Sequence, residues 1–205
     1  MPAKTIPLFP LGTVLFPDGY LPLQIFEVRY LDMVRKALAA DSLFGVVTLL
    51  NGAEVRTPEA NESLAATGTL ALIRSFAAPM PALMQIQCIG QSRFRLISSE
   101  RQRNGLWTGE VELLVPDQVV SIPDELDDTA TALGRLLRTL QEQPVPEDEM
   151  PFQAPFRLDE AGWVANRWAE LLPLATQDKL RLLEQDNPLL RLELIQDALH
   201  EHGVL

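Results

Sequence analysis

The spacing of apolar residues changes near Val115, and this change limits the possible folds more than any other feature of the chain. Before Val115, apolar residues form short runs or alternate with polar ones, as they do in β-strands. After it, they recur every three or four residues, as they do in amphipathic helices. The sequence therefore predicts an α+β protein, with a β-rich part over residues 1–118 and a helical bundle over residues 119–205.

Several segments of the first part have the composition of strands. Residues 43–50 and 69–73 are short, apolar and bounded by turn-forming residues, which is typical of buried strands. Residues 84–88 alternate between apolar and polar side chains, so the apolar ones, including Cys88, share one face. We expect these segments to be strands of the β-rich part.

The strongest local signal is the pair Asn104-Gly105, because Asn-Gly supplies the positive φ angles that a tight turn needs. It separates two strand-like segments, residues 92–99 and 107–114, and so predicts a β-hairpin. Proline cannot donate a hydrogen bond to a strand ladder, so the proline-rich first segment should be an edge strand or a bulged one. The prolines in question are Pro7, Pro10 and Pro17.

One helix is expected to interrupt the strands, because Phe26, Tyr30 and Val34 recur every four residues. On the opposite side of this helix, Asp32 and Lys36 have the spacing of a favourable ion pair. Aromatic residues at strand and helix spacing usually pack inward. We therefore expect core positions for Phe16, Phe26 and Tyr30.

Four helices are predicted after Val115. The first should begin near Ser121, which precedes a proline and an acidic first turn, and the second should span residues 159–172. Thr176 is the expected N-cap of the third. Asn187, followed by Pro188, is the expected N-cap of the last.

Charge separates the two parts of the chain. The 205 residues carry a net charge of −11, of which residues 1–120 contribute −1 and residues 121–205 contribute −10. An acidic chain is a poor ligand for nucleic-acid phosphates, so nucleic acid is an unlikely partner. The single cysteine has no partner for a disulfide, and no window approaches the roughly 20 apolar residues of a membrane span. A cytoplasmic protein without membrane contact is expected.

Residues that would form a catalytic or metal site are sparse. No glycine precedes a lysine, which excludes a P-loop, and no Gly-x-Ser-x-Gly elbow occurs. His200 and His202 lie near the C-terminus, and positions two apart on a helix point in different directions, so a metal site is not expected. Cys88 has no histidine to activate it, which favours a buried, inert thiol. The expectation is a non-enzymatic protein with no cofactor and no metal.

The N-terminal motifs resemble those of the substrate-binding N-terminal domain of Lon-type proteases. The resemblance continues through short motifs in the same order along nearly the whole chain. The residues that carry it are 7–11, 14–17, 21–30, 68–69, 90, 93–95, 110–112, 171–174, 179, 182–184 and 191–193.

The resemblance implies a pseudo-barrel related to the PUA fold, followed by a helical bundle. In full-length Lon-type proteases, such a domain resembles a recognition and assembly module placed before an ATPase and a Ser-Lys protease. The chain ends before either, so the expectation is a free-standing module without proteolytic activity. Its expected partners are polypeptides, particularly unfolded or apolar segments, and a homo-oligomer remains among the expectations.

The segment 76–84 is the first candidate for partner binding. It joins two predicted strands, yet it contains none of the polar residues usual in turns. Apolar, Met-containing surfaces suit varied hydrophobic partners, whereas the alternative is that the segment packs onto the protein itself. Its candidate residues are Phe76, Pro79, Met80 and Pro81.

Two further surfaces are weaker candidates. The proline-rich connection at 143–156 contains Phe152 and Phe156, which would either hold the helical bundle against the barrel or contact a partner. The predicted hairpin carries basic residues next to a tryptophan, which would suit RNA if the barrel bound phosphates and stacked on a base. A solvated hairpin face is the simpler interpretation of this cluster. Its members are Arg93, Arg95, Arg101, Arg103 and Trp107.

Overall fold

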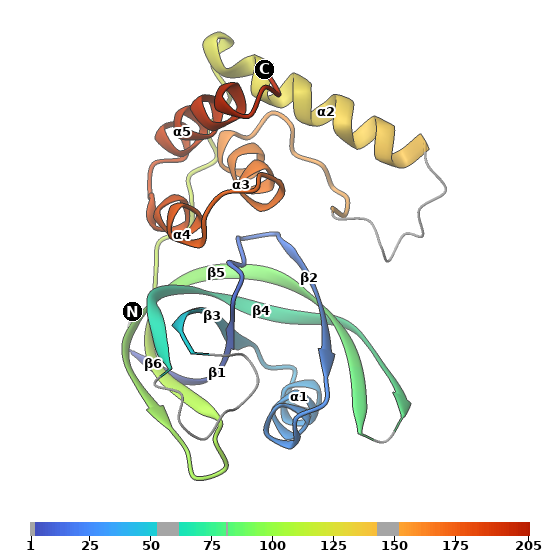
Figure 1. Ribbon diagram of the computed structural model, residues 1–205, viewed down its shortest axis with the longest axis vertical. Coiled ribbons are helices and arrows are strands. Elements are labelled where there is room, and N and C mark those ends of the chain that lie inside the picture. The colour runs from blue at the N-terminus through green and yellow to red at the C-terminus, as the bar shows by residue number, and fades with distance from the viewer. Residues whose placement is uncertain (1–2, 53–61, 81, 143–151) are drawn as a thin grey trace. The chain divides into compact units, whose positions relative to one another are not determined.

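The computed structural model describes residues 3–52, 62–80, 82–142 and 152–205 (Figure 1). The chain forms two compact units, Met1–Pro116 and Asp117–Leu205. The first is the β-rich unit and the second is the helical unit. Among the described residues, every strand lies in the first unit, and every α-helix except Val28–Ala40 lies in the second, which confirms the predicted α+β class. The domain boundary at residue 118 stays a prediction.

The β-rich unit contains one mixed sheet of six strands in the order β2-β5-β4-β3-β1-β6. Strand β5 also pairs with β6, so the sheet curls into a barrel-like ring that is not evenly closed. Strand β2 lies outside this ring and pairs along the first half of β5. The strands are β1 (Lys4–Leu11), β2 (Tyr20–Ile25), β3 (Phe44–Asn51), β4 (Ser63–Met80), β5 (Leu83–Arg101) and β6 (Trp107–Leu113).

The hairpin predicted around Asn104-Gly105 is confirmed as β5–β6. Gly105 has a φ of 85°, and the side chain of Asn104 accepts a hydrogen bond from the Leu106 N–H at 3.0 Å. These are the properties for which Asn-Gly is selected in tight turns. Local residue chemistry therefore determines this part of the ring.

Strand β1 is not an edge strand, which corrects the expectation drawn from its prolines. It pairs in parallel with β3 over Leu8–Leu11 and antiparallel with β6 over Lys4–Leu8. The two pairings share only Leu8, so Pro7 lies where β6 is the partner and Pro10 lies where β3 is. Each proline thus has a flank with no strand beside it, where its missing N–H removes no ladder bond.

Helix α1 (Val28–Ala40) lies between β2 and β3 in the chain and packs one face into the core of the β-rich unit. Tyr30 and Val34 are buried as predicted, at 4% and 0% exposure. Phe16 is buried as well. Phe26 was expected in the core, but it precedes the N-cap Glu27 and is 57% exposed. The helix begins after Phe26, so the four-residue stripe does not include it.

The ion pair observed on α1 involves a different cation from the predicted one, Lys36. Asp32 pairs with Arg35, with Oδ1 and Nη1 3.2 Å apart, and not with Lys36. Both i,i+3 and i,i+4 neighbours lie on the same side of a helix, so spacing alone does not choose between the two cations.

The helical unit consists of a short 3-10 turn followed by four α-helices. Its first α-helix begins later than predicted, because Ser121 forms a β-bridge with Glu160. Asn187 caps the last helix as predicted, since its side chain accepts hydrogen bonds from two backbone N–H groups. Thr176 is the first residue of its helix, whose N-cap is Ala175. The elements are η1 (Asp124–Leu126), α2 (Asp127–Glu142), α3 (Ala161–Leu171), α4 (Thr176–Glu184) and α5 (Pro188–Glu201).

A buried arginine organises the core of the helical unit. Arg191 of α5 is 1% exposed and pairs with Asp117, with Nη1 and Oδ2 2.5 Å apart. It also donates to the side chain of Asn166 at 3.0 Å and to the carbonyl of Leu182 at 3.0 Å. A buried charge with this many partners ties three segments of the unit together.

Candidate functional site

An apolar groove in the β-rich unit runs along β2 and is the main candidate site. Its volume is about 200 Å³. One wall comes from the end of β1, the other from β2, and the start of α1 contributes the rest. We call it the β1–β2 groove. It is lined by Phe9, Leu11, Pro22, Leu23, Gln24, Ile25, Phe26, Glu27 and Tyr30.

The groove lies between β1 and β2, two described strands that are not hydrogen-bonded to each other. Among the described strands, β2 pairs only with β5 (Figure 1). At the end of β1, residues 9–11 pair with β3, but the pairing with β6 has already stopped at Leu8. The groove therefore lies between two strand edges, and strand edges offer main-chain hydrogen-bonding groups to a further strand.

Aromatic stacking shapes the inner surface of the groove. The rings of Phe9 and Tyr30 stack with their centroids 4.1 Å apart. The guanidinium of Arg29 lies 4.5 Å from the centre of the Tyr30 ring, and its Nε is 3.0 Å from Oε2 of Glu27. Glu27 thus has its charge balanced by Arg29. The Tyr30 phenol is neutral at physiological pH, and burial raises its pKa further, from 10.0 to about 12. A neutral, aromatic lining suits an apolar ligand.

Phe26 stands at the mouth of this groove and is exposed. The register explains its position, because Ile25 pairs with Met84 near the tip of the β4–β5 hairpin. Phe26 therefore lies where β2 ends beside that hairpin. Its 57% exposure gives the groove an apolar rim open to solvent.

The segment predicted as an apolar loop is the tip of the β4–β5 hairpin. Phe76 pairs with Ile86 and Met80 with Leu83, so both strands continue into it. Phe76 is 57% exposed and Met80 is 59% exposed. Pro79 is exposed as well, while Pro81 lies outside the described residues. Residues 76–80 are therefore exposed, whereas Met84, at the other end of the predicted segment, is buried at 8% exposure. A partner-binding role for Phe76, Pro79, Met80 and Pro81 stays a prediction.

The two aromatic residues of the connection are buried or half-buried. Phe152 is only 4% exposed. The ring of Phe156 is half-buried and meets the Trp163 ring edge-on, with centroids 6.4 Å apart. Residues 143–151 lie outside the described residues. A partner-binding role for these two phenylalanines stays a prediction.

The arginines of the hairpin are mostly engaged. Arg93 is 4% exposed. Arg95 pairs with Glu112, and Arg101 lies 3.4 Å from a carboxylate oxygen of Glu62. That same carboxylate accepts a hydrogen bond from the Trp107 indole N–H at 2.6 Å. These acidic partners reduce the positive potential that the RNA alternative requires; Arg103, on the turn, is exposed. RNA binding stays untested.

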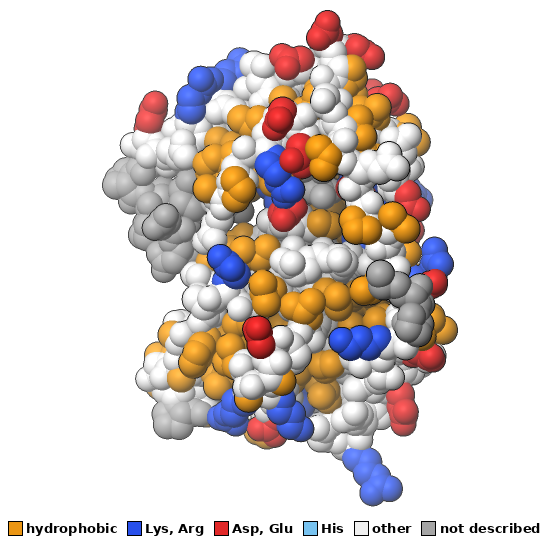
Figure 2. All heavy atoms as spheres, turned by 180° about the vertical axis from the view of Figure 1, so that it is seen from behind, with side chains coloured by type: hydrophobic (Ala, Val, Ile, Leu, Met, Phe, Trp, Pro, Cys, Tyr) orange, Lys and Arg blue, Asp and Glu red, His pale blue; other side chains and the backbone are white. Residues whose placement is uncertain are grey.

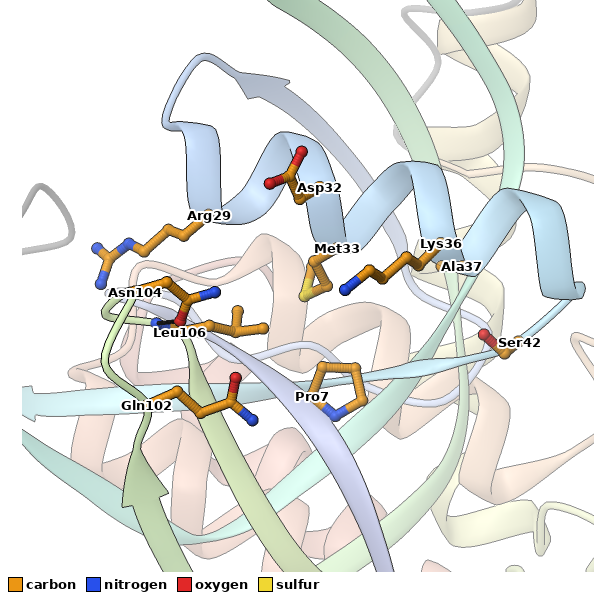
Figure 3. Close-up of a pocket in the computed structure, with 10 residues that line it drawn as sticks. All are labelled: Pro7, Arg29, Asp32, Met33, Lys36, Ala37, Ser42, Gln102, Asn104 and Leu106. Atoms are coloured by element: carbon orange, nitrogen blue, oxygen red, sulfur yellow. Dashed lines mark hydrogen bonds between the residues drawn. The ribbon is translucent and has the colours of Figure 1, made fainter.

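A second, smaller pocket lies between α1 and the β5–β6 turn. It has a volume of about 130 Å³ and a mixed lining. Figure 3 shows Met33 and Lys36 extending from α1, and Gln102 and Asn104 coming from the turn. Arg29 joins the two sides, because its Nη1 donates to the carbonyl of Gly105 at 2.7 Å. The pocket is smaller than the groove and is lined by more charged residues, and the Arg29 bond across it gives it a structural role in fixing α1 to the hairpin.

The other candidate groups lie apart from the groove surface. Cys88 is fully buried, and burial raises the pKa of its thiol to about 12. His200 is in the last turn of α5, and His202 is its C-cap. In the described part of the chain, no three His, Cys, Asp or Glu side chains are grouped so that they could hold a metal ion. No helix there has the length and apolar character needed to cross a membrane.

Sequence reasoning missed the groove, since it placed Phe26 in the core and did not consider Phe9 or Leu11. One signal was available. Pro22 interrupts an otherwise strand-like run, residues 20–25, and a proline inside such a run marks an edge strand. An edge strand next to buried aromatics predicts a groove of this kind.

Charge distribution sets the β-rich unit apart from the helical unit. Figure 2 shows many acidic side chains on the helical unit, whereas basic, acidic and hydrophobic side chains are mixed on the visible face of the β-rich unit. This agrees with the sequence balance of −10 for residues 121–205 against −1 for residues 1–120. The acidic excess therefore does not lie on the unit that carries the groove.

Known proteins share both the fold and the sequence pattern. The Lon N-terminal domain protein from Xanthomonas campestris has 35% sequence identity and a TM-score of 0.76, over 95% of this chain and 98% of that one. The N-terminal domain of Lon protease from the Mycobacterium avium complex has the same fold at 16% identity, with a TM-score of 0.65 over 97% of this chain and 100% of that one.

Longer proteins match as well. Lon protease of Desulfosudis oleivorans is 25% identical over 202 residues, which are 96% of this chain and 24% of that protein. Protein cereblon of Danio rerio is 28% identical over 127 residues, or 60% of this chain and 28% of cereblon. The chain thus spans about a quarter of the length of these relatives. A family model for the substrate-binding domain of the ATP-dependent protease La (LON) matches residues 5–201, so the chain belongs to the Lon substrate-binding domain family.

Proposed function

We propose that this protein is a non-catalytic recognition module that binds unfolded or apolar segments of other polypeptides. The observation that carries the proposal is the neutral, apolar β1–β2 groove, open to solvent beside exposed Phe26. The exposed hairpin tip with Phe76 and Met80 extends the same kind of surface. The family description as a substrate-binding domain supports this function.

The size of the groove supports a polypeptide ligand. Pockets for drug-sized molecules and cofactors usually measure about 300–1,000 Å³. A groove of about 200 Å³ is smaller and holds one or two side chains of a longer chain. Exposed apolar residues around it would then contact the neighbouring residues of that chain.

The proposal includes no chemical step. Among the described residues that sequence reasoning considered for catalysis, the Cys88 thiol is buried and protonated, and the two histidines lie at the end of α5. Binding should therefore be independent of ATP and leave the polypeptide intact. A cytoplasmic setting, in which unfolded segments and a reduced Cys88 occur together, fits this role.

Fluorescence anisotropy with a short, labelled, unstructured peptide rich in leucine and phenylalanine tests the proposal. We expect saturable binding without ATP, weakened about tenfold or more by Phe26→Ser or by the double change Phe76→Ser and Met80→Ser. Val119→Ser is a matched control, because Val119 is 79% exposed but belongs to the helical unit. Equal affinity for all four proteins would refute the proposed surface, and absence of saturable binding would refute the function.

A further inference from the structure

We propose that the bound polypeptide adds as a β-strand along the outer edge of β2, with inward side chains placed in the β1–β2 groove. This inference rests on the proposed function and specifies how the ligand is held. It also defines the ligand more narrowly, as an extended segment with apolar side chains at alternate positions.

The first support is the regular ladder between β2 and β5. Six consecutive pairs run from Tyr20↔Ile89 to Ile25↔Met84, with no register shift. In such an antiparallel pair, alternate residues direct both N–H and C=O to the partner, and the residues between them direct both groups away. Half of β2 therefore presents main-chain groups to the side of the groove.

Pro22 shows which residues of β2 direct their main-chain groups away from β5. Proline has no N–H, so within an unbroken ladder it occupies a position whose nitrogen faces away from the partner. Leu21, Leu23 and Ile25 then bond to β5, and Pro22 and Gln24 face outward. The outer edge thus offers the carbonyls of Pro22 and Gln24 and the N–H of Gln24.

The second support is the absence of charge along β2. Exposed edge strands are usually protected by lysines, other charges, prolines, bulges or a covering segment. The residues of β2, Tyr-Leu-Pro-Leu-Gln-Ile, include no charged side chain, and the strand has no bulge. Pro22 limits pairing at a single position only. Such an edge accepts another strand, as in peptide recognition by strand addition.

The third support is the lining beside this edge. Side chains of a strand point alternately to its two faces. Every second side chain of an added strand would therefore meet Phe9, Leu11 and Tyr30, whereas the others would face outward and tolerate polar groups. The neutral lining and the small volume select leucine- or phenylalanine-sized side chains at the inward positions.

A polypeptide from another protein is the occupant that these features favour. A second copy of this chain that paired symmetrically through its own β2 would bring a second Pro22, which removes a donor from a ladder of only six residues. A segment of another protein without proline at the bonded positions loses no such bond.

Peptide N-methylation tests this inference, because it removes one N–H at a time. In an added strand, only alternate N–H groups bond to β2. We expect methylation at alternate positions to weaken binding about three- to tenfold each, and methylation at the positions between them to have little effect. Uniform sensitivity, or none, would overturn strand addition while leaving polypeptide binding itself intact.

A matched pair of protein variants gives an independent readout. Gln24→Pro removes the outward N–H at a position that resembles that of Pro22, whereas Gln24→Ala keeps it. Both variants lose the Gln24 side chain from the groove lining, so only the comparison between them reports on the N–H. We expect Gln24→Pro to bind peptide about tenfold more weakly than Gln24→Ala does, with equal thermal unfolding showing that both are folded. Equal affinity of the two variants would overturn the inference. A wild-type dimer that Gln24→Pro dissociates, and that peptides do not disrupt, would also overturn it, because the edge would then serve a second copy.

Discussion

The ring of Phe9 in β1 stacks on the ring of Tyr30 in α1, with the two centroids 4.1 Å apart. This contact joins the first strand to the inserted helix, and both residues also line the β1–β2 groove. The same side chains thus stabilise the β-rich unit and form its proposed binding surface.

Replacing Tyr30 by alanine should lower the free energy of unfolding by about 3–5 kcal/mol, because a large buried ring is lost. Tyr30→Phe keeps the stacked ring and removes only the hydroxyl, so we expect a change within about 1 kcal/mol. Urea unfolding followed by fluorescence measures both. A large effect of Tyr30→Phe would show that the hydroxyl, and not the stacking, is the main contribution.

Replacing Arg191 by alanine should destabilise the helical unit by about 3–5 kcal/mol, since it leaves the carboxylate of Asp117 and the Asn166 side chain without their buried partner. Arg181→Ala is the control. Arg181 pairs with Asp178 on the surface, where an ion pair contributes about 0–1 kcal/mol. Thermal unfolding with a probe in the helical unit should separate the two variants, and equal shifts would contradict the assigned role of Arg191.

Replacing Gly90 by alanine should destabilise the β-rich unit strongly. A Cβ at this position would lie 2.1 Å from the carbonyl oxygen of Phe16, which is backbone and has little room to shift. We expect a loss of about 2–3 kcal/mol or more. Gly134→Ala in α2 is the contrasting variant, because its nearest neighbour would be 3.3 Å away at the end of the Leu158 side chain. Alanine favours a helix interior by about 0.5–1 kcal/mol, so Gly134→Ala should be neutral or stabilising in the same denaturation assay.

The protein should lose stability at alkaline pH. Burial raises the pKa of Cys88 from 9.0 to about 12 and the pKa of Tyr30 from 10.0 to about 12. At a pH between the ordinary and the raised pKa of each group, the unfolded chain has released a proton that the folded chain still holds. The free energy of unfolding therefore falls as pH rises from about 9 to 12. Below about pH 9 both groups are protonated in the folded and the unfolded chain alike, so the free energy of unfolding has not yet begun to fall for this reason.

Chemical denaturation at a series of pH values measures this decline. The Cys88→Ala variant should have a slope shallower by up to about 1.4 kcal/mol per pH unit, whatever its stability at neutral pH. A slope identical to that of the wild-type protein would mean that Cys88 does not retain its proton in the fold.

Features determined by neighbouring residues could be predicted from the sequence. The Asn104-Gly105 turn and the Asn187 cap depend on the conformations and side chains of a few adjacent residues, and both are where they were expected. The alternation at residues 84–88 likewise predicted which side chains of β5 are buried. Local chemistry of this kind is readable without tertiary information.

Features determined by distant parts of the chain could not be predicted in the same way. Pro7 and Pro10 indicated an edge strand, yet β1 has partners on both sides because β3 and β6 each cover only part of it. Phe26 matched the helical spacing, but the helix begins two residues later. The groove depends on where two separate pairings end. Pro22 indicates that β2 is an edge strand, but no local pattern shows that β1 stops pairing with β6 at Leu8.

The division of β1 between two partners has a consequence for synthesis of the protein. Its first half pairs with residues 107–111, about a hundred positions later in the chain, and its second half pairs with residues 45–48. During translation, Leu8–Leu11 can find their partner early, whereas Lys4–Leu8 must wait until β6 has left the ribosome. Until then the nascent β-rich unit leaves one flank of its first strand unpaired, which is the period when it is most open to aggregation or to assistance by chaperones.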